Sequence, residues 1–188
     1  MLVLVAGLIV FLGVHTFTTL RAQRAAVIGR LGEGPYKGLY SLASAVGLVL
    51  IVWGFGHYRS TGWVQVWYPP AAMRHIAMPL MWFAFVALAA AYSPLGKIKA
   101  TLRHPMLVAV KTWALAHLLA NGDLGGMLLF GSLLAWAVYD RIAVKRRGDA
   151  GAPPSGFTSG DMIAIAVGTV AFVAMLWLHP TLIGVAII

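Results

Sequence analysis

Six long apolar runs occupy most of this 188-residue chain, and they limit its fold more than any other feature. The hydrocarbon core of a bilayer is about 30 Å thick, so a helix that crosses it needs roughly 20 mostly apolar residues. Hydrophobic residues make up 61% of the sequence and charged residues 10%, which excludes a water-soluble domain. The sequence therefore predicts an all-α membrane protein, a single-domain bundle of about six transmembrane helices over residues 1–188. The runs cover residues 2–20, 39–56, 76–92, 106–120, 124–139 and 162–178.

The basic residues between these runs predict how the bundle is oriented. Eleven of them fall in alternate loops, after the first, third and fifth runs, whereas Arg59 and Arg74 follow the second run. By the positive-inside rule the richer loops face the cytoplasm, so both termini are expected on the non-cytoplasmic side. This placement accounts for the net charge of +9 without nucleic-acid binding. The eleven are Arg21, Arg24, Arg30, Lys37, Lys97, Lys99, Arg103, Arg141, Lys145, Arg146 and Arg147.

Local signals indicate where several helices begin and end. Asn121-Gly122 is expected to end the fourth helix, with glycine in the left-handed conformation, and Asp123 to cap the next helix in a tight hairpin. Pro105 suits the first turn of the fourth helix. Residues 1–20 lack a basic stretch before their apolar run, which favours a retained span over a cleaved signal peptide. The Gly-, Pro- and Ser-rich segment 148–160 is typical of a flexible linker, here cytoplasmic.

The polar inventory excludes several chemistries. The five acidic residues lie in predicted loops or at predicted helix ends, which argues against a carboxylate proton relay or metal site at membrane depth. The sequence has no cysteine, so thiolate ligands and thiol catalysis are excluded. No Ser/His/Asp arrangement or phosphate-binding glycine loop is present. Three histidines, His57, His75 and His179, fall on the predicted outer side, where an interfacial role and a shared ligand pocket both stay open.

Two histidines, His15 and His117, lie inside apolar runs. An imidazole in hydrocarbon is costly unless it finds a partner, and intramembrane ionisable groups often mark functional sites. A hydrogen bond to a neighbouring helix would explain them equally well. At 100° per residue, His15 shares a helix face with Phe11, and His117 shares one with Trp113. Such apolar and aromatic stripes usually pack against other helices, but with two imidazoles they also suit haem, whose iron takes axial histidine ligands.

A haem cofactor would need partners for its carboxylates as well. Lys111 and His104 share a different face of the fourth helix and could bind them at the cytoplasmic edge, although snorkelling explains Lys111 more simply. His15 lies six residues before Arg21, about 9 Å from that edge, and His117 lies about 18 Å from it. If both ligate one iron, the cofactor must tilt or the fourth helix must start shallower. Otherwise His117 would pair with an outer-side histidine.

Several segments closely resemble the NnrU family of bacterial integral membrane proteins. They are "FLGVHTFTTLRAQR", "YKGLYSLAS", "GHYRSTG", "RHPMLVAVKTWALAHLLANGD" and "LLAWAVYDR", spread over nearly the whole chain. The resemblance implies a place in the bacterial inner membrane and a link to denitrification, in nitrite and nitric oxide metabolism. It also implies similarity to 15-cis-ζ-carotene isomerase, a haem b enzyme that isomerises a carotenoid double bond.

Carried over by motif, the two haem-ligating histidines of that isomerase fall on His15 and His117. The isomerase has a cysteine three residues before the second ligand, implicated in redox-dependent ligand exchange, where this chain has Ala114. The resemblance thus implies haem b binding, whereas isomerase activity is in doubt. "RHP" also resembles the start of a cofactor motif in membrane methyltransferases, but the later paired acidic motif of those enzymes is missing.

Three functional hypotheses follow. The first is a haem b protein of nitrogen-oxide metabolism with His15 and His117 as metal ligands and Trp113, Lys111 and His104 as further cofactor-binding residues. The second is a haem-dependent cis–trans isomerase of a carotenoid-like polyene, acting within the bilayer. The third is a cofactor-free structural partner of another membrane complex. The expected partners are therefore membrane lipid, an apolar polyene or nitrogen-oxide ligand, and a further copy of the chain or another membrane protein.

Overall fold

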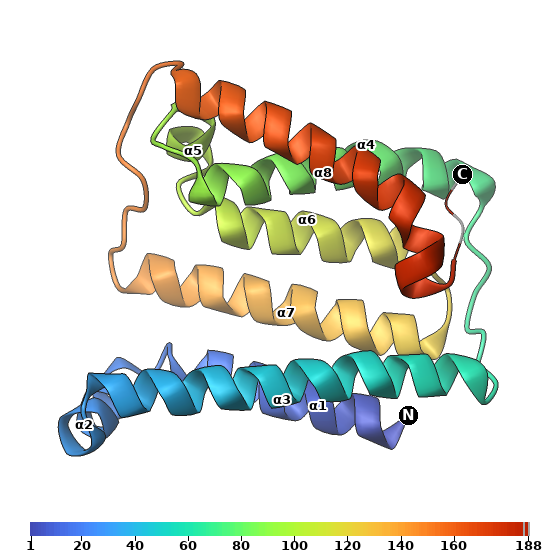
Figure 1. Cartoon of the computed structure of the whole chain (residues 1–188), viewed down its shortest axis with the longest axis horizontal. Coiled ribbons are helices and arrows are strands. Elements are labelled where there is room, and N and C mark those ends of the chain that lie inside the picture. Colours follow the sequence, from blue (N-terminus) through green and yellow to red (C-terminus); the bar gives the residue numbers. More distant parts are fainter. Residues whose placement is uncertain (186, 188) are drawn as a thin grey trace. The chain divides into compact units, whose positions relative to one another are not determined.

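The computed structural model describes residues 1–185 and residue 187, and this part of the chain forms eight helices (Figure 1). One isolated antiparallel bridge, between Gln65 and Asp123, is the only extended pairing among the described residues. The all-α prediction is therefore confirmed. In chain order the helices are α1 (Leu2–Phe17), α2 (Arg21–Leu31), α3 (Glu33–Ser60), α4 (Ala71–Tyr92), α5 (Lys97–Leu102), α6 (Pro105–Ala120), α7 (Leu124–Arg146) and α8 (Ser159–Ile183).

The chain divides into two compact units. Met1–Pro69 together with Asn121–Ala143 makes the first unit, which contains α1, α2, α3 and nearly all of α7. Pro70–Ala120 together with Val144–Ile188 makes the second, which contains α4, α5, α6 and α8. Such a division does not decide whether residues 1–188 form a single domain, so that stays a prediction.

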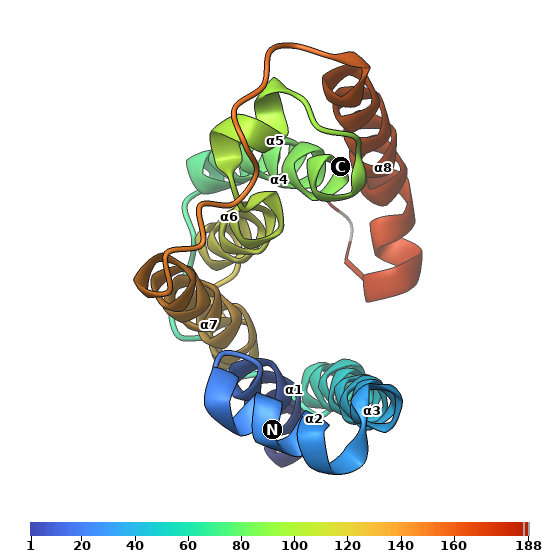
Figure 2. The ribbon, with the colours of Figure 1, turned by 90° about the vertical axis from the view of Figure 1, so that its left-hand side faces the viewer.

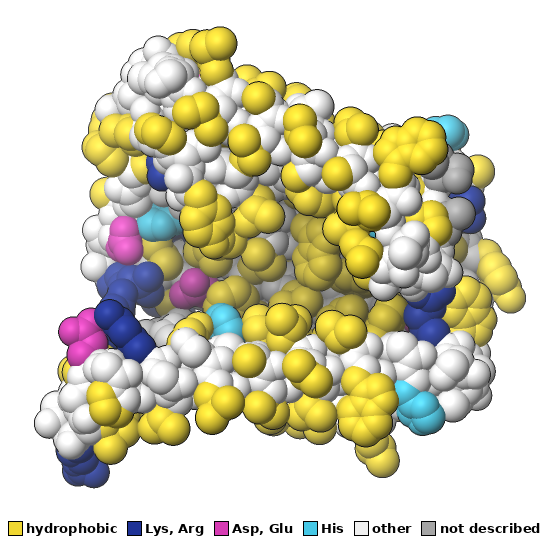
Figure 3. Space-filling view, viewed as in Figure 1, with side chains coloured by type: hydrophobic (Ala, Val, Ile, Leu, Met, Phe, Trp, Pro, Cys, Tyr) yellow, Lys and Arg dark blue, Asp and Glu magenta, His cyan; other side chains and the backbone are white. Residues whose placement is uncertain are grey.

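Five of the six predicted apolar runs are helical throughout and the first is helical as far as Phe17, but the count of six spans is not confirmed. Four helices, α3, α4, α7 and α8, are long and apolar enough to cross a membrane. A fifth candidate is the pair α1 and α2, which bends by 89° at the break between them. The apolar helix α6 has 16 residues and is therefore about 24 Å long, shorter than a 30 Å hydrocarbon core. The helices nonetheless indicate a membrane protein, and hydrophobic side chains cover the visible faces of α3 and α8 (Figure 3).

In the first unit, glycines bring α1 and α3 into close contact. Figures 1 and 2 both show the two helices side by side. A Cβ atom on Gly47 would lie 2.7 Å from the backbone nitrogen of Phe11, and one on Gly54 would collide with the backbone of Leu4. Gly7 of α1 approaches the backbone of α3 just as closely. Small residues allow such backbone approach between helices in a membrane.

The connector between α6 and α7 lies where it was predicted, but the predicted conformation of its glycine is wrong. The fourth predicted helix begins at Pro105 and ends at Ala120, as expected, and the Asp123 carboxylate accepts the backbone N–H of Gly126 at 2.8 Å. The expectation of a left-handed Gly122 is wrong, because its φ is not positive. Instead, the carbonyl of Trp67 occupies the place of a Cβ, and the carbonyl of Gly122 accepts the N–H groups of Val66 and Trp67.

In the second unit, α4 packs against both α6 and α8 (Figures 1 and 2). The buried carboxylate of Asp161, in the first turn of α8, joins α8 to α5. It accepts the backbone N–H groups of Lys97 at 2.9 Å, Ile98 at 2.7 Å and Thr158 at 2.8 Å. Glycine is needed at position 96, because a Cβ there would meet this carboxylate at 2.5 Å.

The predicted linker runs from the end of α7 to the start of α8, and several hydrogen bonds hold it. The N–H of Ala152 donates to the carbonyl of Arg103 at 3.0 Å, and the hydroxyl of Thr158 donates to the carbonyl of Leu95 at 2.9 Å. These bonds attach the linker to the segment around α5. Its flexibility and its cytoplasmic location stay predictions.

Candidate functional site

His15 lies in the last turn of α1, surrounded by aromatic rings. Its ring centroid is 4.2 Å from that of Phe11, 5.5 Å from that of Tyr40 on α3 and 5.5 Å from that of Trp136 on α7, which meets it edge-on. Its Nδ1 lies 2.7 Å from the carbonyl oxygen of Phe11. A carbonyl only accepts, so this bond assigns the proton to Nδ1 and leaves the lone pair on Nε2.

Three buried polar atoms in the same unit lack partners, and one of them is the hydroxyl of Ser44 on α3. The indole Nε1 of Trp136, beside His15, and the hydroxyl of Tyr36, one turn before Tyr40 on α3, have no hydrogen bond within the described part of the chain. A buried donor without a partner is costly and calls for an explanation such as a bound water, ion or ligand. The indole N–H beside His15 therefore has no hydrogen-bond acceptor among the described residues.

His117 repeats the local arrangement of His15 in the second unit. It lies in the last turn of α6, and its Nδ1 is 2.8 Å from the carbonyl oxygen of Trp113, four residues earlier. The two rings are 5.1 Å apart. The proton is therefore again on Nδ1 and the lone pair on Nε2. A histidine whose Nδ1–H is held by a backbone carbonyl is the usual form of an Nε2 metal ligand.

The other predicted cofactor-binding residues have local roles or none that the structure defines. His104 lies at the linker, where its Nε2 is 3.4 Å from the carbonyl oxygen and 3.8 Å from the carboxylate of Asp149. Arg147 also approaches that carboxylate, at 3.7 Å. Lys111 is half-buried on α6. The contacts of His104 give it a structural role independent of any cofactor.

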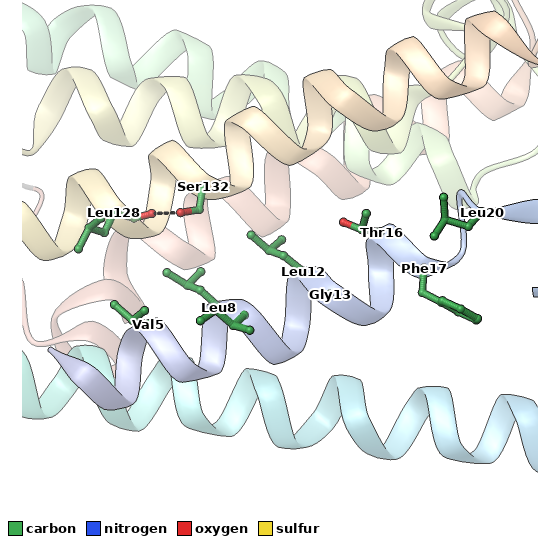
Figure 4. Close-up of a pocket in the computed structure, with 10 residues that line it drawn as sticks. Val5, Leu8, Leu12, Gly13, Thr16, Phe17, Leu20, Leu128 and Ser132 are labelled. Carbon is green, nitrogen blue, oxygen red and sulfur yellow. Dashed lines mark hydrogen bonds between the residues drawn. The ribbon is translucent and has the colours of Figure 1, made fainter. Parts of the chain in front are cut away.

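An apolar groove lies in the first unit, between α1 and α7 (Figure 4). Its volume is about 530 Å³, and Ser132 and Thr16 are the polar side chains along it. The hydroxyl of Ser132 is already bonded to the carbonyl of Leu128, at 2.5 Å. The lining residues are Val5, Leu8, Ile9, Leu12, Gly13, Thr16, Phe17, Leu20, Leu128 and Ser132. This groove and the approach of Tyr40 and Trp136 to His15 were not predicted from the sequence.

Comparison with known protein families identifies the family of this chain. A family model described as NnrU protein matches residues 3–187, which is nearly the whole chain. The chain belongs to the NnrU family. No curated protein and no solved structure matches it.

In this NnrU protein, the two compact units each contain one of the predicted haem ligands. His15 belongs to the first unit and His117 to the second, and their joint ligation of one cofactor stays a prediction. The side chains of His57 and His75 are exposed, and Nδ1 of His179 is 2.8 Å from the carbonyl oxygen of Val185. Across the described residues, no three His, Cys, Asp or Glu side chains gather as a metal site. Axial ligation of a haem iron needs only one or two histidines.

No local signal in the sequence pointed to Trp136. It lies near the end of the fifth apolar run, four residues before Asp140, where an interfacial tryptophan is ordinary. Its position beside His15 depends on how α7 packs against α1, which no local pattern contains.

Proposed function

We propose that this NnrU-family protein binds haem b in the bacterial inner membrane, with His15 and His117 as axial ligands, and acts in nitrite or nitric oxide metabolism. The observation that carries the proposal is the shared geometry of the two histidines. Each holds its Nδ1–H on the carbonyl four residues earlier, beside an aromatic side chain, and directs its lone pair through Nε2.

The surroundings of His15 are chemically suited to a haem. Apolar and aromatic side chains keep water away and suit the flat porphyrin face, and the neutral imidazole is the form that binds iron. The unsatisfied N–H of Trp136 supports a bound group that offers a hydrogen-bond acceptor next to this histidine. When bound, haem supplies one-electron chemistry and an iron that binds small gases such as nitric oxide.

The backbone bond fixes what His15 and His117 contribute. It sets the tautomer and limits rotation of each ring, so the ligand nitrogen is oriented before the cofactor binds. The isomerase alternative has less support, because the position that matches its redox cysteine is Ala114, a buried side chain without a thiol.

Absorption spectroscopy tests the proposal. Protein purified in mild detergent and reconstituted with haemin should show a Soret band, and sharp α and β bands after reduction with dithionite. His15→Ala and His117→Ala should each shift these bands or abolish them. His75→Ala is the matched control, since the exposed side chain of this histidine makes no hydrogen bond among the described residues, and it should leave the spectrum unchanged.

Two outcomes would reject the proposal in different ways. A protein without haem bands after reconstitution would leave the cofactor-free membrane partner as the explanation. Haem bands that survive both substitutions would mean that other residues ligate the iron. Trp136→Phe adds a finer test, because it keeps an aromatic ring and removes the donor. It should retain haem while changing the position of the bands.

A further inference from the structure

The groove between α1 and α7 is lined by aliphatic side chains and runs along most of α1. Val5 and Phe17, its first and last lining residues within α1, are 12 residues apart, which corresponds to about 18 Å along the helix, and Leu20 lines the groove just beyond the helix end. One leaflet of a bilayer has a hydrocarbon layer of about 15 Å, so the groove is long enough for one acyl chain. The groove has free space beside Gly13, because a Cβ there would meet no atom within 4 Å.

Positive charge lies at the Leu20 end of this groove. Arg21 follows Leu20 directly and begins α2, which turns away from α1 by 89°. Arg21 is exposed, and Arg24, one turn on, lies over the ring of Tyr36 at 5.5 Å. None of the ion pairs among the described residues includes Arg21 or Arg24. An apolar groove that ends at two arginines matches a molecule with an apolar tail and an anionic head.

We propose that this groove binds an anionic phospholipid, with one acyl chain along α1 and the phosphate next to Arg21 and Arg24. Guanidinium groups bind phosphate strongly and in defined geometry, and each basic residue near an anionic membrane surface contributes about 1 kcal/mol, which is roughly fivefold in binding. The site is independent of haem, because its walls do not include either candidate ligand.

Other occupants fit less well. A carotenoid-like polyene has no charged group and would leave the arginines unused. A helix from a second copy of the chain would have to bring an acidic residue to Arg21. The sequence has only five acidic residues, and Glu33 already pairs with Lys37 at 2.7 Å. The anionic lipid is therefore the occupant that uses both features of the groove.

Native mass spectrometry of the full-length protein in mild detergent tests the site. Delipidated protein is mixed with equal amounts of phosphatidylglycerol and phosphatidylcholine, and the bound adducts are counted. The wild-type protein should retain one phosphatidylglycerol in preference to phosphatidylcholine. Arg21→Gln should lower this preference about fivefold. Arg30→Gln removes another exposed arginine, at the far end of α2, and should leave the preference unchanged.

Filling the groove tests the position of the acyl chain. Gly13→Phe and the milder Gly13→Leu place a side chain in open space inside the groove and should abolish the retained lipid. Gly56→Phe is the matched control, because a Cβ on this exposed glycine of α3 also meets no atom, yet Gly56 is outside the groove. Circular dichroism and gel filtration check that each variant is folded.

Four results would overturn the proposal. These are wild-type lipid retention in both Gly13 variants, equal retention of the two phospholipids, tighter binding of an added polyene than of phosphatidylglycerol, and a dimer that Gly13→Phe converts to a monomer. The last would assign the groove to a second copy of the chain. None of these readouts depends on haem, so the proposed function can fail while this proposal stands.

Discussion

The close approach of α1 and α3 predicts opposite effects for two substitutions on one helix. In Gly47→Ala, the new methyl group would lie 2.7 Å from the nitrogen and 2.9 Å from the Cα of Phe11. Non-bonded atoms pack best at about 3.5–4.0 Å, so α1 has to retreat by roughly 1 Å. In Gly56→Ala, the same methyl group enters open space.

The magnitudes follow from these two environments. Overpacking typically costs about 1–3 kcal/mol, while alanine in place of glycine within a helix gains about 0.5–1 kcal/mol. Gly47→Ala should therefore lower the free energy of unfolding by about 1–2 kcal/mol. Gly56→Ala should leave it unchanged or raise it by up to about 1 kcal/mol. Combining Gly47→Ala with Gly54→Ala should cost less than the sum, because one displacement of α1 relieves both contacts.

Unfolding by sodium dodecyl sulfate in mixed micelles, followed by far-ultraviolet circular dichroism, measures these differences. Circular dichroism reports the helix content of the whole protein, so each variant is compared with the wild type by the shift in the midpoint of the transition. Equal stability of Gly47→Ala and Gly56→Ala would refute the reasoning, since it would mean that α1 and α3 can separate without loss. A stabilised Gly47→Ala would refute it more strongly.

Three further predictions concern two helix ends and the chain termini. Asp123→Ala should destabilise the protein by about 1–2 kcal/mol in the same assay, because the N–H of Gly126 loses its acceptor at the start of α7; Asp123→Asn, which keeps a capping oxygen, should cost less. Asp161→Ala should speed proteolysis within residues 147–158, because three backbone N–H groups lose their acceptor and α8 is released from α5. Asp140→Ala is its control, since the side chain of Asp140 makes no hydrogen bond or ion pair among the described residues, and cleavage at the same rate in both variants would contradict the role of Asp161. Reporter fusions at both termini should be active on the non-cytoplasmic side of the membrane. With an outer N-terminus, an even number of spans places the C-terminus outside as well, so a cytoplasmic C-terminus would contradict the predicted topology.

Local signals in the sequence predicted local structure well. Pro105 begins α6 and Asp123 caps α7, since both effects depend on a few neighbouring residues. The glycine after α6 was predicted correctly as a helix end but for the wrong reason. Its conformation is ordinary, and what excludes a side chain there is the carbonyl of Trp67, more than 50 residues away in the sequence.

Two helices were missed because the residues that form them look like loops. The segment "RAQRAAVIGRL" forms α2 although its N-cap, Leu20, makes no capping bond through its side chain, and the short α5 begins where Asp161 accepts its first N–H groups. Sequence patterns could not settle the number of spans either. With 16 residues each, α1 and α6 have a length between that of a membrane-crossing helix and that of a shorter buried one.

The candidate site was predicted in part. The stripes that pair Phe11 with His15 and Trp113 with His117 are present, because residues four apart on a helix are neighbours. The approach of Tyr40 and Trp136 to His15 was not predicted, since it requires three helices to pack together. The role of the histidine backbone bonds also required the structure, because a sequence does not specify which ring nitrogen donates.

The hydrogen bonds of the Asp161 carboxylate to α5 can form only late in the synthesis of the chain. This carboxylate bonds to backbone groups of α5 that precede it by up to 64 residues, so α5 leaves the ribosome well before its partner exists. At about 5–20 residues per second, translation needs roughly 3–13 s to deliver the missing acceptor. During that interval the segment around α5 lacks this acceptor while α6 and α7 are synthesised. The last helix then completes a contact in a part of the chain that was made long before it.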